Sequence, residues 1–232
     1  MVALTAIGSL FEAGQGVPQD FDKALGWFEK AAAAGDVSGM REVGFLFLQG
    51  LGVPKNEAAA RELFDKAAAG GDVEAFAAIG FMYELGAGVP ANSGTAREWY
   101  EKAAAGGFAP ANYLIGDMYL NGDGVVQNDV AAREWYEKAA AGGFALASYK
   151  IGDMYFDGRG SPQDYVKARE WFEKAAAGGD ADAMDRLSLM YEEDGKGVRR
   201  DQAKAREWHE KADARRSLVI KQTLSATFRN FH

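Results

Sequence analysis

A repeat of 36 residues is the feature that most constrains how this chain folds. The segment EWYEKAAAGGFA stands at residues 98–109 and again, unchanged, at residues 134–145. Its tryptophan column recurs six times, at intervals of 36 residues and finally 37: Trp27, Leu63, Trp99, Trp135, Trp171 and Trp208. A GxG loop recurs in the same phase, with its first glycine at Gly14, Gly50, Gly86, Gly122, Gly158 and Gly195. Two columns in phase over six copies predict an array of stacked structural units.

Each copy is expected to form two helices joined by the GxG loop. The second helix follows an aspartate or asparagine in every copy: Asp20, Asn56, Asn92, Asn128, Asp164 and Asp201. Such a side chain accepts a hydrogen bond from the free backbone N–H groups of a first turn, so these residues predict helix starts. The glycines of AAAGG then supply the left-handed conformation that ends the helix.

The first helix carries a small residue at one fixed position: Gly8, Gly44, Gly80, Gly116, Gly152 and Ser188. Glycine destabilises a helix by about 1 kcal/mol relative to alanine, so its recurrence predicts a close approach of the partner helix. We expect the tryptophan and tyrosine of the repeated segment to pack each hairpin. Its alanines would let neighbouring hairpins approach one another.

The repeated columns resemble the Sel-one-like repeat (SLR) family, an α/α solenoid related to the tetratricopeptide repeats. The match is clearest in ANYLIGDMYLNGDGVVQNDVAAREWYEKAAAGG, and the departures are Leu63, His209 and Ser161. The resemblance implies six helix-turn-helix repeats, at about residues 1–35, 36–71, 72–107, 108–143, 144–179 and 180–216. It also implies an all-α, right-handed superhelix whose first helices line a concave face, and a role as a protein–protein scaffold. Bacterial members are often adaptors in signalling, secretion, envelope or host-contact pathways.

The charge and composition exclude several other classes. A net charge of −8 disfavours nucleic acid and anionic membrane surfaces as partners. The chain has no cysteine, which excludes disulfide scaffolds and thiolate chemistry. The first ten residues lack the basic and apolar regions of a signal peptide. We therefore expect a soluble protein that is cytoplasmic, or periplasmic or secreted if an upstream signal was removed.

Catalytic chemistry is not expected. His209, in a packing column, and His232 are the two histidines, too few for a triad or a histidine-based metal site. The GxG loops lack the GxxxxGK[ST] pattern of a phosphate site. We predict no cofactor, no metal and no enzymatic activity. The alternatives are an immunity or inhibitor protein for a secreted toxin and an enzyme acting on cell-wall or β-lactam compounds.

The concave groove is the expected partner site, because residues that vary between repeats carry recognition in solenoids. By the resemblance to tetratricopeptide arrays, its lining comprises Phe45, Leu48, Phe81, Tyr113, Asp117, Leu120, Tyr149, Lys150, Asp153 and Phe156. Apolar area rimmed by charge favours a peptide or amphipathic helix with apolar anchors and a basic residue opposite Asp117 and Asp153. In the alternative interpretation, the aromatic residues fill space between adjacent first helices.

The end of the chain departs from the repeat. Ile220, Leu224, Phe228 and Phe231 form one apolar stripe at helical spacing, with Ser217 as a candidate N-cap. We expect residues 217–232 to form a separate helix that covers the last repeat. Alternatively, this helix binds a second molecule and forms a homodimer.

Overall fold

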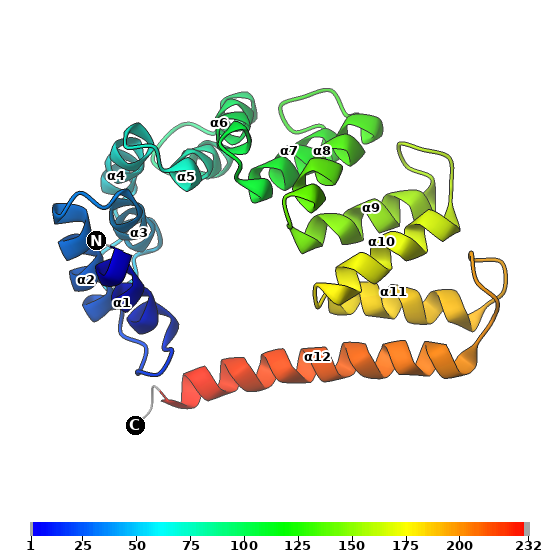
Figure 1. Cartoon of the computed structure of the whole chain (residues 1–232). Coiled ribbons are helices and arrows are strands. Elements are labelled where there is room, and N and C mark those ends of the chain that lie inside the picture. Colours follow the sequence, from blue (N-terminus) through cyan, green and yellow to red (C-terminus); the bar gives the residue numbers. More distant parts are fainter. Residues whose placement is uncertain (1, 230–232) are drawn as a thin grey trace. The chain divides into compact units, whose positions relative to one another are not determined.

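The structure, a computed structural model, describes the backbone of residues 2–229 and the side chains of residues 3–219. This part of the chain contains helices and no strand, which confirms the predicted all-α class (Figure 1). The helices are α1 (Val2–Ala13), α2 (Phe21–Ala33), α3 (Val37–Gln49), α4 (Glu57–Ala69), α5 (Val73–Leu85), α6 (Ser93–Ala105), α7 (Ala109–Asn121), α8 (Asp129–Ala141), α9 (Ala145–Asp157), α10 (Tyr165–Ala177), α11 (Ala181–Glu192) and α12 (Gln202–Arg229).

The helices pair into hairpins, as the repeat predicts. The chain divides into two compact units, of which the first contains α1–α6 and the second runs from Gly107 to Lys221. Inside each unit, the second helix of one hairpin packs on the first helix of the next: α2 on α3, α4 on α5, α8 on α9 and α10 on α11. Each unit is therefore an array in which a hairpin contacts its neighbours in sequence.

The predicted N-caps are confirmed. Asn128 is typical, since its side-chain oxygen accepts a hydrogen bond from the Ala131 N–H at 3.1 Å. Equivalent bonds start α2, α4, α6 and α10, and Asp201 caps α12 in the same way. Among the first helices, α7 and α9 differ because they follow Phe108 and Phe144, which provide no side-chain cap. These two phenylalanines serve packing instead.

The close approach predicted from the glycine column is confirmed, and its partner is an aromatic ring. A Cβ added at Gly116 would lie 2.6 Å from Cε1 of Tyr136. The same relation pairs the other four glycines with a ring that is fully buried: Phe28, Phe64, Tyr100 and Phe172. Each ring belongs to the residue after the tryptophan column. The tryptophans themselves are only half-buried, so the ring beside the glycine is the main packing element of each hairpin.

The last helix is longer than expected. α12 runs without interruption through Ser217, so the prediction that Ser217 begins a separate helix is wrong. Its first part forms the sixth hairpin, with Ala205 and Ala212 buried. The apolar stripe from Ile220 to Phe231 lies outside the described side chains. Neither α12 nor any other described helix is apolar enough over sufficient length to cross a membrane.

Candidate protein-binding surface

In the first unit, the expected groove residues come from α3 and α5. Phe81 is 41% exposed, and Leu85, one helical turn later, is 62% exposed. Phe45, at the repeat position of Phe81, is half-buried and meets Phe64 edge-on, with ring centroids 5.0 Å apart. Leu48 is only 8% exposed and packs in the core of this unit, so its predicted place in an open groove is wrong.

In the second unit, the expected groove aromatics lie at the edge of the core. The Tyr113 ring packs against Tyr136 and Phe144, with centroid distances of 5.4 and 5.2 Å. Tyr149 and Phe156 both pack against the ring of Phe172, at 5.8 and 6.4 Å. Leu120 also packs partly buried on this core. These rings pack mainly within their own hairpins, α7 on α8 and α9 on α10, and the Tyr113–Phe144 contact reaches the next repeat. The interpretation that the aromatics fill space between adjacent first helices stays a prediction.

The groove aspartates of the second unit have partners within the chain. Asp117 accepts a hydrogen bond from the Tyr136 hydroxyl at 2.5 Å, and its Oδ1 lies 3.9 Å from Nζ of Lys150. On the next first helix, Oδ1 of Asp153 lies 3.1 Å from Nε of Arg186. These ion pairs join α7 to α9 and α9 to α11. Both aspartates thus already have a basic partner within the chain, and their expected role in meeting a basic residue of a binding partner stays a prediction.

Burial affects the ionisation of this cluster. Burial raises the pKa of Tyr113 to about 12, and the negative charge of Asp117 acts in the same direction. The pKa of Asp153 is also raised, because burial of its carboxyl outweighs the nearby Arg186. The phenol of Tyr113 is therefore neutral at physiological pH and can act as a hydrogen-bond donor.

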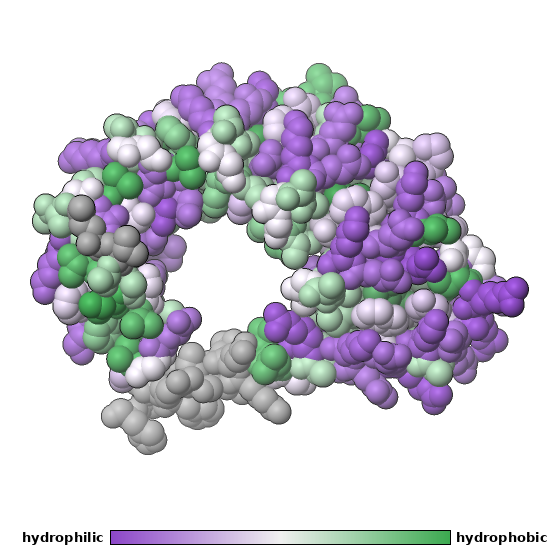
Figure 2. Space-filling model, viewed as in Figure 1, coloured by the Kyte–Doolittle hydropathy of each residue, from purple (hydrophilic) through white to green (hydrophobic). Residues whose placement is uncertain are grey.

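In Figure 2, the visible surface over α9, α10 and α11 is mostly hydrophilic.

One variable position of the first helix makes contacts between repeats; it holds Thr5, Arg41, Ala77, Tyr113, Tyr149 and Asp185. In four of the six copies, its residue contacts the residue 31 positions later, which lies just before the next first helix or, for Arg216, within α12. The contact differs in kind from copy to copy: a hydrogen bond (Thr5 to Asp36), a salt bridge (Arg41 to Asp72), a ring contact (Tyr113 to Phe144) and a second salt bridge (Asp185 to Arg216). In these four copies, the residue at this position is therefore matched to a neighbouring residue of the same chain.

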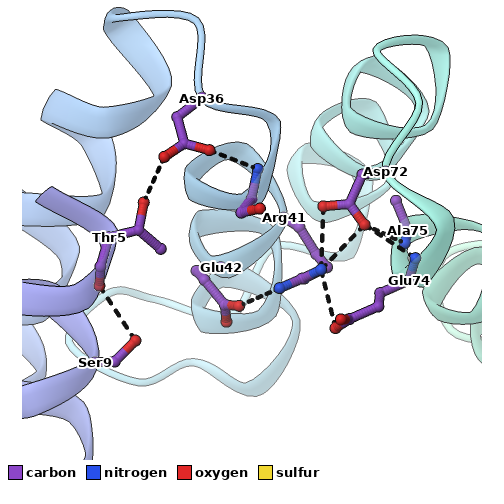
Figure 3. A network of polar contacts seen from close by, with 9 residues as sticks. Thr5, Ser9, Asp36, Arg41, Glu42, Asp72, Glu74 and Ala75 are labelled. Carbon is purple, nitrogen blue, oxygen red and sulfur yellow. Dashed lines mark hydrogen bonds and ion pairs between the residues drawn. The ribbon is translucent and has the colours of Figure 1, made fainter. Parts of the chain in front are cut away.

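The salt bridge of Arg41 is the best developed of these contacts (Figure 3). Nη1 of Arg41 donates to both carboxylate oxygens of Asp72 at 3.0 Å, and it lies 2.9 Å from Oε2 of Glu74. Nη2 donates to Glu42 at 2.7 Å. Asp72 also accepts hydrogen bonds from the N–H groups of Glu74 and Ala75, so the same carboxylate caps α5. Both side chains are buried.

His209 does not pack as its column predicts. Its side chain is 63% exposed, with Nδ1 3.5 Å from Asp185 and Nε2 3.6 Å from Asp213. The sequence-based prediction of a packing histidine is therefore wrong. The side chains that the structure describes contain no cluster of three or more metal-ligating residues.

Leu85 is the surface residue that the sequence interpretation missed. It lies one position beyond the columns assigned to the groove, yet it follows Phe81 by one turn of α5. The i, i+4 spacing of two large apolar residues on one helix was the available signal.

Comparison with known proteins agrees with the fold. The family model of the Sel1 repeat matches residues 2–36, 37–72, 74–108, 109–144, 145–180 and 181–212. No curated protein matches the sequence significantly.

Three solved structures illustrate the similarity. A Sel1 repeat protein from Oxalobacter formigenes is 33% identical, with a TM-score of 0.81 over 92% of this chain and 87% of that one. A protective antigen of uropathogenic Escherichia coli with an SLR fold is 29% identical, with a TM-score of 0.62 over 92% of this chain and 53% of that one. An immunity protein from Pseudomonas aeruginosa is 20% identical, with a TM-score of 0.67 over 93% and 81%, and supports the fold alone. Because the family model covers most of the sequence, the chain belongs to the Sel1 repeat family.

Proposed function

We propose that this protein is a non-catalytic scaffold that binds a partner protein through the first helices of its first unit. The single observation that carries the proposal is the exposure of Phe81 and Leu85, one turn apart on α5. With Phe45, which stands at the repeat position of Phe81 on α3, they define what we call the α3–α5 patch. Large apolar residues that gather at a protein surface mark interaction sites, and phenylalanine is enriched at interfaces.

The spacing of Phe81 and Leu85, one turn apart, distinguishes this patch from single exposed residues on other first helices: Leu10 (42%), Leu146 (51%) and Leu189 (48%). Val130 and Val166, each 47% exposed, are examples of single apolar residues on second helices. Scattered residues of that kind are normal on any soluble protein. Burying the patch under a partner would remove apolar area from water, which is worth about 25 cal/mol per Å².

The charge of the chain indicates the chemistry of the partner. Glu84 lies beside Leu85 in the sequence of α5 and is exposed, and the chain carries a net charge of −8. An amphipathic helix or peptide with apolar anchors flanked by lysine or arginine would complement this surface, because opposite charges speed encounter and fix orientation.

Site-specific crosslinking followed by binding measurements tests the proposal. A photo-crosslinking phenylalanine analogue at position 81 should capture a partner that the same analogue at position 166 does not. With the captured partner purified, Phe81→Ala/Leu85→Ala should weaken binding by at least about tenfold, the effect of losing one or more apolar anchors. Val130→Ala/Val166→Ala is the matched control and should bind normally. Equal binding by both double variants, at unchanged helicity, would reject the α3–α5 patch.

The immunity or inhibitor alternative stays a prediction, since the likeness to the Pseudomonas immunity protein is one of fold. It would use the same kind of surface for a single toxin, so the captured partner distinguishes it from an adaptor. The cell-wall or β-lactam alternative gains no support from the geometry of the described side chains.

A further inference from the structure

The sixth hairpin lacks the ring that fills the other five. In those hairpins, an aromatic side chain of the second helix lies over a glycine of the first helix. The sixth hairpin has Ser188 in place of the glycine and His209 in place of the ring. Since His209 is exposed and directed to Asp185 and Asp213, it does not occupy the space that Tyr100 occupies in the third hairpin.

Ser188 shows that this space differs from its counterparts. In the third hairpin, a Cβ at Gly80 would lie 2.7 Å from the Tyr100 ring and 3.1 Å from the backbone oxygen of Ala96. In the sixth hairpin, the hydroxyl of Ser188 donates a hydrogen bond of 2.8 Å to the equivalent oxygen, that of Ala205. A side chain fits at this position, and among the described residues the pocket lining around it holds no phenylalanine, tyrosine or tryptophan.

A pocket of about 530 Å³ occupies this part of the sixth hairpin. Its lining includes Ser188 and Glu192 from α11 and Ala205, Arg206 and His209 from α12. The volume lies within the range of small-ligand pockets, roughly 300–1,000 Å³. It is large enough for an aromatic side chain.

Glu192 gives the pocket a specific acceptor. In the third hairpin, the hydroxyl of Tyr100 donates a hydrogen bond of 2.5 Å to Oε2 of Glu84. Glu192 stands at the repeat position of Glu84. Among the described residues, no donor or cation pairs with the Glu192 carboxylate. The pocket thus combines space for a ring with the carboxylate that accepts a phenol hydroxyl elsewhere in this chain.

We propose that this pocket binds a phenol ring supplied from outside the chain, with the ring against Ser188 and Ala205 and the hydroxyl donating to Glu192. The ligand is either a tyrosine side chain of a partner protein or a free small phenol. The site lies on α11 and α12, so it does not depend on the α3–α5 patch of the first unit.

A titration of the full chain with p-cresol, the tyrosine side-chain analogue, tests the proposal by amide NMR. We expect p-cresol to shift the resonances of Ser188, Glu192 and Ala205. Toluene lacks the hydroxyl and should bind about tenfold more weakly, as expected for the loss of a hydrogen bond to a charged group. Absence of shifts at the pocket, or equal binding of toluene, overturns the proposal.

Two variants built from residues that the chain already uses sharpen the test. Ser188→Gly/His209→Tyr restores the glycine–ring pair of the third and fourth hairpins, so it should abolish p-cresol binding and raise the Tm. Glu192→Leu places the residue found at Leu48 and Leu120, so it should keep the pocket but remove the preference for p-cresol over toluene. Retained p-cresol binding by the folded double variant overturns the proposal. If that variant loses helicity, the Glu192→Leu result decides alone.

A second pair of probes distinguishes a tyrosine side chain of a partner protein from a free small phenol as the source of the ring. Binding of N-acetyl-tyrosinamide in preference to N-acetyl-phenylalaninamide supports a tyrosine of a partner protein. Binding of p-cresol without binding of N-acetyl-tyrosinamide supports a free phenol. A pocket covered by a second copy of this chain would show no p-cresol shifts in a dimeric sample, and that result overturns the proposal. Loss of partner binding in Phe81→Ala/Leu85→Ala does not bear on these outcomes.

Discussion

Single glycines in this protein have opposite roles that depend on what lies beside them. Gly116 on α7 faces the buried ring of Tyr136. Gly26 on α2 has no atom within 4 Å of the place that a Cβ would occupy. The first glycine is required by packing, whereas the second only weakens its helix.

This difference predicts opposite effects of the same substitution. Gly116→Ala should lower the free energy of unfolding by about 1–3 kcal/mol, the usual effect of overpacking a core. Gly26→Ala should raise it by about 0.5–1 kcal/mol, because alanine is the better helix former. Thermal unfolding followed by circular dichroism measures both. A stabilising Gly116→Ala would contradict the packing role of the glycine column.

Leu48 and His209 were wrongly predicted because each was interpreted from its repeat column, although its contacts depend on its own copy. Leu48 stands in a column that holds glutamate in three other copies, and its burial follows from the surrounding core of its own unit. His209 follows the tryptophan column, but in its copy both members of the glycine–ring pair are replaced, by Ser188 and by His209 itself. The residue type that most repeats share at a position predicts the contacts that most repeats make. It does not predict the contacts of one repeat in which both contacting residues differ from that type.

Contacts between helices of adjacent repeats specify how the hairpins stack. In the first unit, the buried Arg41–Asp72 salt bridge connects the start of α5 to α3. In the second unit, the Arg159–Asp129 pair makes a comparable contact at 3.0 Å, but both side chains are more exposed. Because it is more buried, the Arg41–Asp72 pair should contribute more to the free energy of unfolding than the Arg159–Asp129 pair.

Arg41→Ala should lower the free energy of unfolding by about 3 kcal/mol, because it leaves the buried Asp72 carboxylate without its cation. Arg159→Ala should cost no more than about 1 kcal/mol, since exposed pairs are screened by water. Urea unfolding of the two variants compares them directly. Equal losses would show that burial does not determine the strength of these pairs.

The helix starts show how far local sequence alone can predict an element. Asx residues marked all the second helices correctly, because an N-cap acts on the turn that follows it. Ser217 failed as a start because the segment KADARRSLVI around it holds no glycine or proline that would end the preceding helix. A capping residue predicts a helix start only where the chain before it is free to leave the helix.

At the scale of the molecule, the two units present different first-helix surfaces. The first unit exposes Phe81 and Leu85 one turn apart on α5. The second joins its first helices through the Asp117–Lys150 and Asp153–Arg186 pairs and exposes Leu189 at the repeat position of Phe81. The family and the paired-helix architecture could be predicted from the repeated columns. Which variable residues remain available to a partner could not, because that depends on contacts with neighbouring repeats.

Removal of residues 217–232 tests what the end of α12 does. If this segment covers the last hairpin, a chain that ends at Arg216 should have a lower Tm and should aggregate, because it exposes apolar surface. Arg215 and Arg216 would keep their contacts with Gly179 and Asp185. Light scattering and thermal unfolding against the full chain measure the effect. A clean monomer of unchanged Tm, derived from a dimeric parent, would instead support exchange between two molecules.

The contacts between residues 31 positions apart also affect how such a protein gains and loses repeats over evolution. Loss of the second hairpin would set Thr5 beside Asp72, which offers the same kind of acceptor as Asp36. Loss of the third would set Arg41 beside Phe108, so its guanidinium would keep Glu42 but lose the carboxylate of Asp72. Whole hairpins are therefore not interchangeable modules, and some deletions should be inherited far more readily than others.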